Sequence, residues 1–96
     1  MLHLVFNLFD TSLFTRLSNQ QSIIVFLDNS VLSLLEGSIF EDKLFELTQL
    51  APCYVLLDDL VFRGLLQEQL IKGVTCINNA ELVKLAIEHT PIYSWN

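Results

Sequence analysis

The sequence predicts an α/β protein, a flavodoxin-like three-layer sandwich with helices on both faces of a parallel sheet. Short, wholly apolar runs, typical of strands buried on both faces, alternate with segments of helical periodicity. Most runs are followed by Asp, Asn or Ser, which favour helix starts. The 96 residues contain no internal repeat and no low-complexity linker, so we expect one domain spanning residues 1–96.

Four apolar runs predict the strands. The clearest is residues 23–27, which are β-branched, aromatic or leucine throughout. The other three runs are at residues 2–6, 53–57 and 74–77. A flavodoxin-like sheet would place these four strands in the order 2-1-3-4, so that the first and third strands are neighbours. Their carboxyl ends would then enclose the crevice in which ligands usually bind.

Capping and turn residues in the first half of the chain predict three helices. One follows Asp10, and another covers residues 31–35, is capped by the run Asp28-Asn29-Ser30 and ends at Gly37. The third covers residues 40–50, where apolar residues recur at helical spacing.

Two further helices are expected in the second half. Asp58 or Asp59 would cap a short helix that ends at Gly64, a residue suited to the left-handed position past a helix end. Asn78 or Asn79 would cap the last helix. The remaining segments are predicted to be a loop or irregular helical turn at residues 65–72 and a tail at residues 92–96.

The composition predicts assembly with other proteins. Hydrophobic residues make up 52% of the chain, charged residues only 17%, and the mean hydropathy is +0.50. A small domain cannot bury so much apolar surface alone, so we expect a stable interface. The net charge of −6 and five scattered basic residues argue against direct nucleic-acid binding. Without a secretory pattern or a membrane-spanning apolar run, the sequence predicts a cytoplasmic protein with no membrane partner.

The two cysteines, Cys53 and Cys76, are candidates for nucleophilic chemistry. Both fall in predicted strands, and neither has metal-ligand spacing to another cysteine or to His3 or His89. Buried free cysteine usually behaves as a small hydrophobe, so structural roles are favoured and catalytic roles are the weaker alternative. We therefore predict no catalytic residue, no cofactor and no metal site in this chain.

Several aspartates follow the predicted strands. Asp10, Asp28, Asp58 and Asp59 suit a Mg²⁺ pocket of the receiver-domain type, or else helix capping, which explains them without a ligand. A receiver domain also needs a fifth strand and a lysine after it, so capping is favoured. Asp10, Asp58 and Asp59 would lie beside the crevice.

Arg63 and the C-terminal aromatic residues have two interpretations each. Arg63 would bind an anion, or would complement the helix dipole and pair with Asp59. Tyr93 and Trp95 would anchor a subunit interface, or would pack on the chain's own sheet.

Four stretches together resemble the DsrH/TusB family over essentially the full length of the chain. The segment from Leu57 to Leu65, Leu-Asp-Asp-Leu-Val-Phe-Arg-Gly-Leu, resembles the family's Glu-Asp-Leu-x-x-Arg-Gly-Leu. Asp28-Asn29-Ser30-Val31, followed by Glu36-Gly37, resembles its Gln-Asp-Gly-Val turn and helix. The other two stretches are the opening Met1-Leu2-His3 and the closing segment that contains Leu82-Val83-Lys84-Leu85, His89 and Trp95.

The resemblance implies a DsrEFH-like fold and a role in a cytoplasmic sulfur relay. TusB-like chains assemble with TusC-like and TusD-like subunits into a heterohexamer with two copies of each. The complex takes persulfide sulfur from a TusA-like donor and passes it to a TusE-like acceptor, for 2-thiolation of the tRNA wobble uridine. The resemblance places the reactive cysteine on the TusD-like subunit. DsrH relatives carry a cysteine in the first helix region, but residues 10–21 contain none, which favours a non-catalytic, TusB-type subunit.

Two rival functions stay open at this point. In the first, the chain would itself be a sulfurtransferase that carries persulfide on Cys76 or Cys53, or would be a DsrH-type sulfur-oxidation protein. Alternatively, it is a small receiver-like module that binds a metal ion or phosphate.

Overall fold

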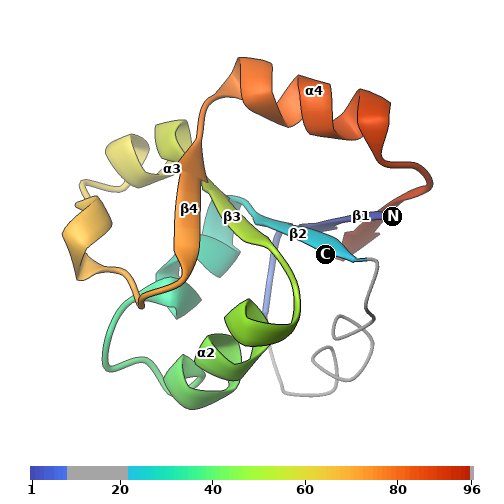
Figure 1. The fold of residues 1–96 in the computed structure, drawn as a ribbon. Helices are drawn as coiled ribbons and strands as arrows, with labels where there is room; N and C mark the ends of the chain where they lie inside the picture. The colour runs from blue at the N-terminus through green and yellow to red at the C-terminus, as the bar shows by residue number, and fades with distance from the viewer. Residues whose placement is uncertain (9–21, 96) are drawn as a thin grey trace.

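The computed structural model describes residues 1–8 and 22–95 and contains a five-stranded, wholly parallel sheet (Figure 1). The strand order is β4-β3-β2-β1-β5. The strands are β1 (Leu2–Val5), β2 (Ile23–Phe26), β3 (Cys53–Leu56), β4 (Val74–Ile77) and β5 (Ile92–Trp95). The predicted α/β class, the parallel sheet and the positions of the first four strands are confirmed.

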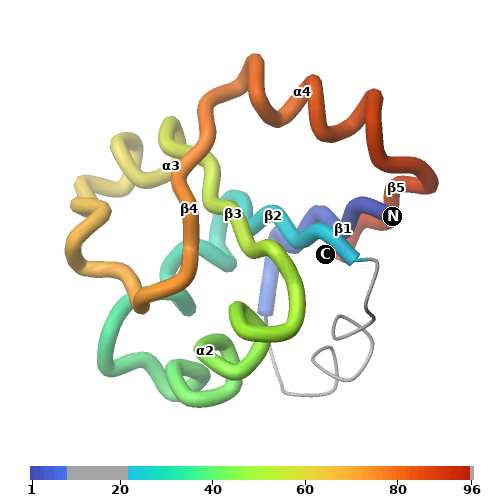
Figure 2. Tube along the Cα trace, in the orientation of Figure 1, coloured from blue at the N-terminus to red at the C-terminus, as the bar shows by residue number. Residues whose placement is uncertain are grey.

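The predicted strand count and the order 2-1-3-4 are wrong. β3 pairs with β2 rather than with β1, and β1 pairs with both β2 and β5. The structure thereby puts β2, the most apolar run, in the middle of the sheet, whereas the predicted order would have left it at an edge. The predicted tail is the fifth strand, with Leu2 opposite Ile92 and Val5 opposite Trp95. The tube in Figure 2 shows the first and last strands of the chain side by side.

Each face of the sheet has its own helical cover, because consecutive residues of a strand point to opposite faces. On one face, strand residues such as Phe26 and Val55 pack with Leu44 of α2 (Glu41–Leu50) and Leu60 of α3 (Leu57–Phe62). On the other face, Val25 packs with residues of α4 (Asn79–Glu88). Figure 1 shows α2 and α4 on opposite sides of the strands. The predicted three-layer arrangement is confirmed.

The first connection after β2 differs from the prediction. The segment predicted as a helix at residues 31–35 is a 3-10 helix, η1 (Asp28–Leu34). Asp28 is its first residue rather than its cap, and the Oγ of Ser30 accepts a hydrogen bond from the Leu27 amide at 3.1 Å. The predicted helix at residues 40–50 is α2. Gly37 and Gly64 have the left-handed φ values expected of them, +88° and +69°.

The later connections are closer to expectation. The 3-10 turn η2 (Gln67–Gln69) lies in the segment predicted as a loop or irregular helical turn. Asn78 caps α4 as predicted: its Oδ1 accepts from the Glu81 amide at 2.8 Å, and Glu81 Oε1 accepts from the Asn78 amide at 3.2 Å. Among the residues that the structure describes, no helix is both long and apolar enough to cross a membrane.

The turn before β4 requires glycine at residue 73. Gly73 has φ +99°, and a Cβ there would lie 2.6 Å from Oγ1 and 2.8 Å from Cβ of Thr48 on α2. Gly64 also has positive φ, but a Cβ there would meet no atom within 4 Å. A side chain at residue 64 would therefore cost only backbone strain, whereas one at residue 73 would cost backbone strain and a steric clash.

We predict that Gly73→Ala destabilises the protein more than the matched control Gly64→Ala. Gly64→Ala should lower the free energy of unfolding by about 1 kcal/mol, the conformational cost of a non-glycine residue at positive φ. Gly73→Ala should cost roughly 3 kcal/mol, because the clash with Thr48 adds to that cost. Urea unfolding measures both values, and equal losses would show that α2 does not approach this turn as closely as described.

Candidate functional site

The topological switch point of this sheet lies between β3 and β4. The chain leaves β3 into α3 on one face and leaves β4 into α4 on the opposite face. Ligand crevices of open α/β sheets form at such a point, outside the carboxyl ends of the strands. The predicted location, between the first and third strands, is wrong because those strands are not neighbours. Asp10, predicted to lie beside the crevice, is outside the described residues.

Polar side chains gather along this edge of the sheet, in what we call the carboxyl-edge cluster. Its members come from η1, α3 and the first residue of α4, and they make hydrogen bonds to one another. They are Asp28, Asn29, Asp58, Asp59, Arg63 and Asn79.

Arg63 is the centre of one half of the cluster. Its Nη2 donates to Asp28 Oδ1 at 2.8 Å and to Asn29 Oδ1 at 2.9 Å, and therefore ties the end of α3 to η1. The predicted pair with Asp59 is wrong. Asp59 instead accepts a hydrogen bond at Oδ2 from the Asp28 amide, at 2.8 Å.

The backbone conformation of Asp28 is consistent with its contacts to Arg63 and Asp59. Asp28 has φ +54°, a left-handed conformation that is uncommon outside glycine but tolerated by Asp. The bonds from Arg63 and to Asp59 hold it there. Such outliers persist only where the surrounding structure fixes them.

The other half of the cluster crosses the switch point. Asp58 Oδ2 accepts from Asn79 Nδ2 at 2.6 Å, which joins α3 to the start of α4. The prediction that Asp58 or Asp59 caps α3 is wrong: the cap position is Leu56, and the helix start has no side-chain capping hydrogen bond. In residues 1–8 and 22–95, no three His, Cys, Asp or Glu side chains lie close enough to hold a metal ion.

Both cysteines lie in strands of the sheet, and neither is a member of this cluster. Cys53 is at the start of β3, 4% exposed, and its Sγ donates to the Ala51 carbonyl at 3.4 Å. Burial raises the pKa of the Cys53 thiol to about 12. Cys76 lies within β4, opposite Val55, and is half-buried. Burial also raises the pKa of Cys76. Neither thiol is in a setting that favours the thiolate.

The C-terminal aromatic residues contact His3, which the sequence did not single out. Trp95 Nε1 donates to His3 Nδ1 at 3.0 Å, and the Tyr93 ring stacks on the imidazole with centroids 5.3 Å apart. His3 Nε2 lies 3.2 Å from Ser22 Oγ. Trp95 is only a donor, so His3 accepts at Nδ1 and, when neutral, carries its hydrogen on Nε2. The sequence feature that could have identified His3 is its position as a polar residue within the apolar first strand.

The interface prediction for these aromatic residues is not decided by that contact. Trp95 is partly buried and packs on the sheet of its own chain. Tyr93 is 44% exposed, at the outer strand of the sheet. A partner subunit at Tyr93 stays a prediction.

We predict a small, salt-sensitive coupling between Arg63 and Asp28. Their side chains are 20% and 60% exposed, so water screens the pair and its contribution should be about 0.5–1 kcal/mol. A double-mutant cycle with Arg63→Met and Asp28→Asn measures the coupling, and Asn keeps the left-handed backbone accessible. Added salt should reduce the coupling. A coupling of zero at low salt would show that the ion pair does not tie α3 to η1.

We predict that His3 makes the stability depend on pH below about 6.5. Burial, and secondarily the positive Met1 amino group, lower the pKa of His3 from 6.5. The unfolded chain therefore binds a proton that the folded chain does not, so stability should fall as the pH drops below 6.5. Urea unfolding followed by Trp95 fluorescence measures this loss. The variant His3→Gln, which does not titrate, should lose less over the same range, and an equal loss would rule out His3 as the cause.

The chain matches a known protein family in sequence and known solved structures in fold. The family model described as DsrH like protein matches residues 6–92. No match was found among curated protein sequences.

Two similar solved structures are MTH1491, a protein of unknown function from Methanobacterium thermoautotrophicum, and the ychN protein from E. coli. The first is 18% identical with a TM-score of 0.74, and the alignment covers 97% of this chain and 95% of the other. The second is 19% identical with a TM-score of 0.75, and the alignment covers 98% and 97%. At these identities, the two structures show a shared fold alone. Because the family model matches nearly the whole chain, this protein belongs to the DsrH/TusB family of the sulfur-relay superfamily.

Proposed function

We propose that this chain is a non-catalytic subunit of a TusBCD-like sulfurtransferase complex, which relays persulfide sulfur for 2-thiolation of the tRNA wobble uridine. Family membership supports the link to sulfur relay. The observation that carries the non-catalytic role is the setting of the two thiols, Cys53 and Cys76.

Sulfur relay requires a thiolate on the receiving protein. The thiolate attacks the outer sulfur of the donor persulfide, the S–S bond breaks, and the donor thiolate leaves. Burial raises the pKa of Cys53 to about 12, so its thiol stays protonated at neutral pH. Cys76 is the more exposed of the two, so it is the thiol that a rival carrier function would use. Burial raises its pKa as well, which disfavours the thiolate there.

Exposed apolar side chains support a role in assembly. Phe62 is 85% exposed and Val61 69% exposed, and both lie on α3 next to the carboxyl-edge cluster. Two large exposed apolar side chains that are neighbours on one short helix suit a protein interface. We assign this surface to contact with TusC-like and TusD-like subunits, of which the TusD-like subunit would carry the reactive thiol. A TusA-like donor, a TusE-like acceptor and a cytoplasmic location complete the proposal.

We predict that a Cys53→Ala, Cys76→Ser double variant supports normal tRNA 2-thiolation in cells that lack the native gene. Alanine avoids placing a hydroxyl in the buried site of residue 53, and serine suits the half-buried site of residue 76. Mass spectrometry of tRNA nucleosides measures the thiolated uridine.

Co-purification of the TusC-like and TusD-like subunits with the variant is the control for assembly. Replacing the reactive cysteine of the TusD-like subunit should abolish thiolation in the same cells. Loss of thiolation by the double variant within an intact complex would contradict the non-catalytic role.

A further inference from the structure

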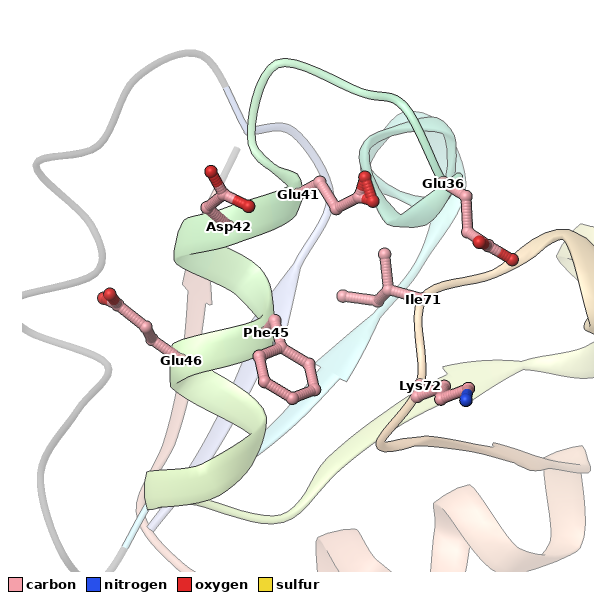
Figure 3. A pocket seen from close by; sticks show the side chains of 7 residues that line it. All are labelled: Glu36, Glu41, Asp42, Phe45, Glu46, Ile71 and Lys72. Atoms are coloured by element: carbon pink, nitrogen blue, oxygen red, sulfur yellow. The ribbon is translucent and has the colours of Figure 1, made fainter.

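We propose that a groove beside α2 docks a basic, amphipathic segment of a partner protein. The groove consists of two adjoining hollows of about 510 and 630 Å³, which share Glu36, Ile71 and Lys72. The first hollow lies between α2 and the segment that leads into β4 (Figure 3). The second hollow continues along residues 66–74. We call this surface the acidic groove.

Backbone contacts hold the far wall of the acidic groove in place. The Ile71 amide donates to the Leu34 carbonyl at 2.9 Å, and the Glu36 amide donates to the Gln69 carbonyl at 3.0 Å. An isolated antiparallel bridge joins Leu35 to Leu70. The wall is therefore built by main-chain bonds before a partner arrives, so little ordering would be needed on binding.

The floor of the groove is apolar. Figure 3 shows the Phe45 ring and the Ile71 side chain facing the space between α2 and the opposite segment. Ile71 is 5% exposed, whereas Phe45 is 47% and Leu66, in the second hollow, 58% exposed. An occupant with apolar side chains would remove Phe45 and Leu66 from water, a favourable change.

The surroundings of that floor are strongly acidic. Five of the chain's eleven acidic residues line the two hollows, against one basic residue, Lys72. These five are Glu36, Glu41, Asp42, Glu46 and Glu68.

Two of the five carboxylates already have a partner, and three could meet an incoming cation. Glu41 accepts a hydrogen bond from the Gly37 amide at 3.0 Å, and Glu46 lies 4.0 Å from Lys43 Nζ at an exposed site. Glu36, Asp42 and Glu68 make no ion pair within the described part of the chain.

Charge complementarity identifies the occupant. An apolar floor with carboxylates along its sides fits a segment that places Lys or Arg on both flanks of an apolar stripe. A bound metal ion does not explain the pattern, because no three of the described ligand-type side chains converge. This inference is independent of the proposed function, since it depends only on the surface of this chain.

Binding of a defined probe to the full-length protein tests the inference. The probe is a fluorescent amphipathic helical peptide made only of leucine and lysine, and fluorescence anisotropy measures its affinity. A Glu36→Gln, Glu68→Gln variant neutralises one carboxylate that lines both hollows and one that lines the second. It should weaken binding about fivefold, the effect of losing two exposed charge contacts. Added salt should weaken binding to the unmodified protein.

The matched control removes two acidic charges from the opposite side of the sheet. Glu81→Gln, Glu88→Gln changes α4 by the same net charge, and glutamine at residue 81 retains the capping box. Binding to this control should stay within about twofold of the unmodified protein. Phe45→Ala should weaken binding while every variant keeps a cooperative melting transition.

Four results would overturn the proposal. They are no binding of the leucine–lysine peptide, equal losses in the two charge variants, equal binding of a lysine–serine peptide without apolar residues, and equal binding of a leucine–glutamate peptide. The second and third would show that the peptide responds to net charge rather than to this groove.

Discussion

The burial of β2 on both faces is the constraint on which the rest of the structure depends. Val25 and Phe26 are adjacent in the chain and fully buried, yet they belong to cores on opposite sides of the sheet. Such a strand is stable only in the middle of a sheet that is covered twice. Among the described helices, α2 and α3 cover one face and α4 covers the other, so the chain changes faces between β3 and β4. The position of the switch point, and of the polar residues beside it, follows from that change.

The carboxyl-edge cluster acts as a clasp at this change of face. Arg63 joins α3 to η1, and Asp58 joins α3 to α4, so one short helix is tied to elements on both sides of the sheet. This edge has the location and polarity of an active site, but neither thiol takes part in the contacts of the cluster. The segment from Leu57 to Leu65, which carries the resemblance to the family, therefore includes residues with clear structural roles. Its exposed part, Val61 and Phe62, is available for a partner.

The sequence predicted features that depend on local chemistry. The apolar run that contains β2, the cap at Asn78 and the left-handed Gly64 each follow from a few neighbouring residues, and all are confirmed. Strand order was missed because it depends on which faces distant segments cover. The fifth strand was missed for the same reason: Trp95 finds its partner, His3, 92 positions away. In the site, the side chains at residues 58, 59 and 63 were assigned to their own helix, whereas they bond to other elements.

The central claim is that the sulfur passes through a thiol on another chain. Its most direct test is the intact mass of each subunit after the co-purified complex is loaded by a cysteine desulfurase and a TusA-like donor. The account predicts that the TusD-like subunit gains the mass of a sulfur atom, reversibly on reduction, while the mass of this chain is unchanged. A reducible gain of one sulfur on this chain, lost when Cys76 or Cys53 is replaced, would contradict it.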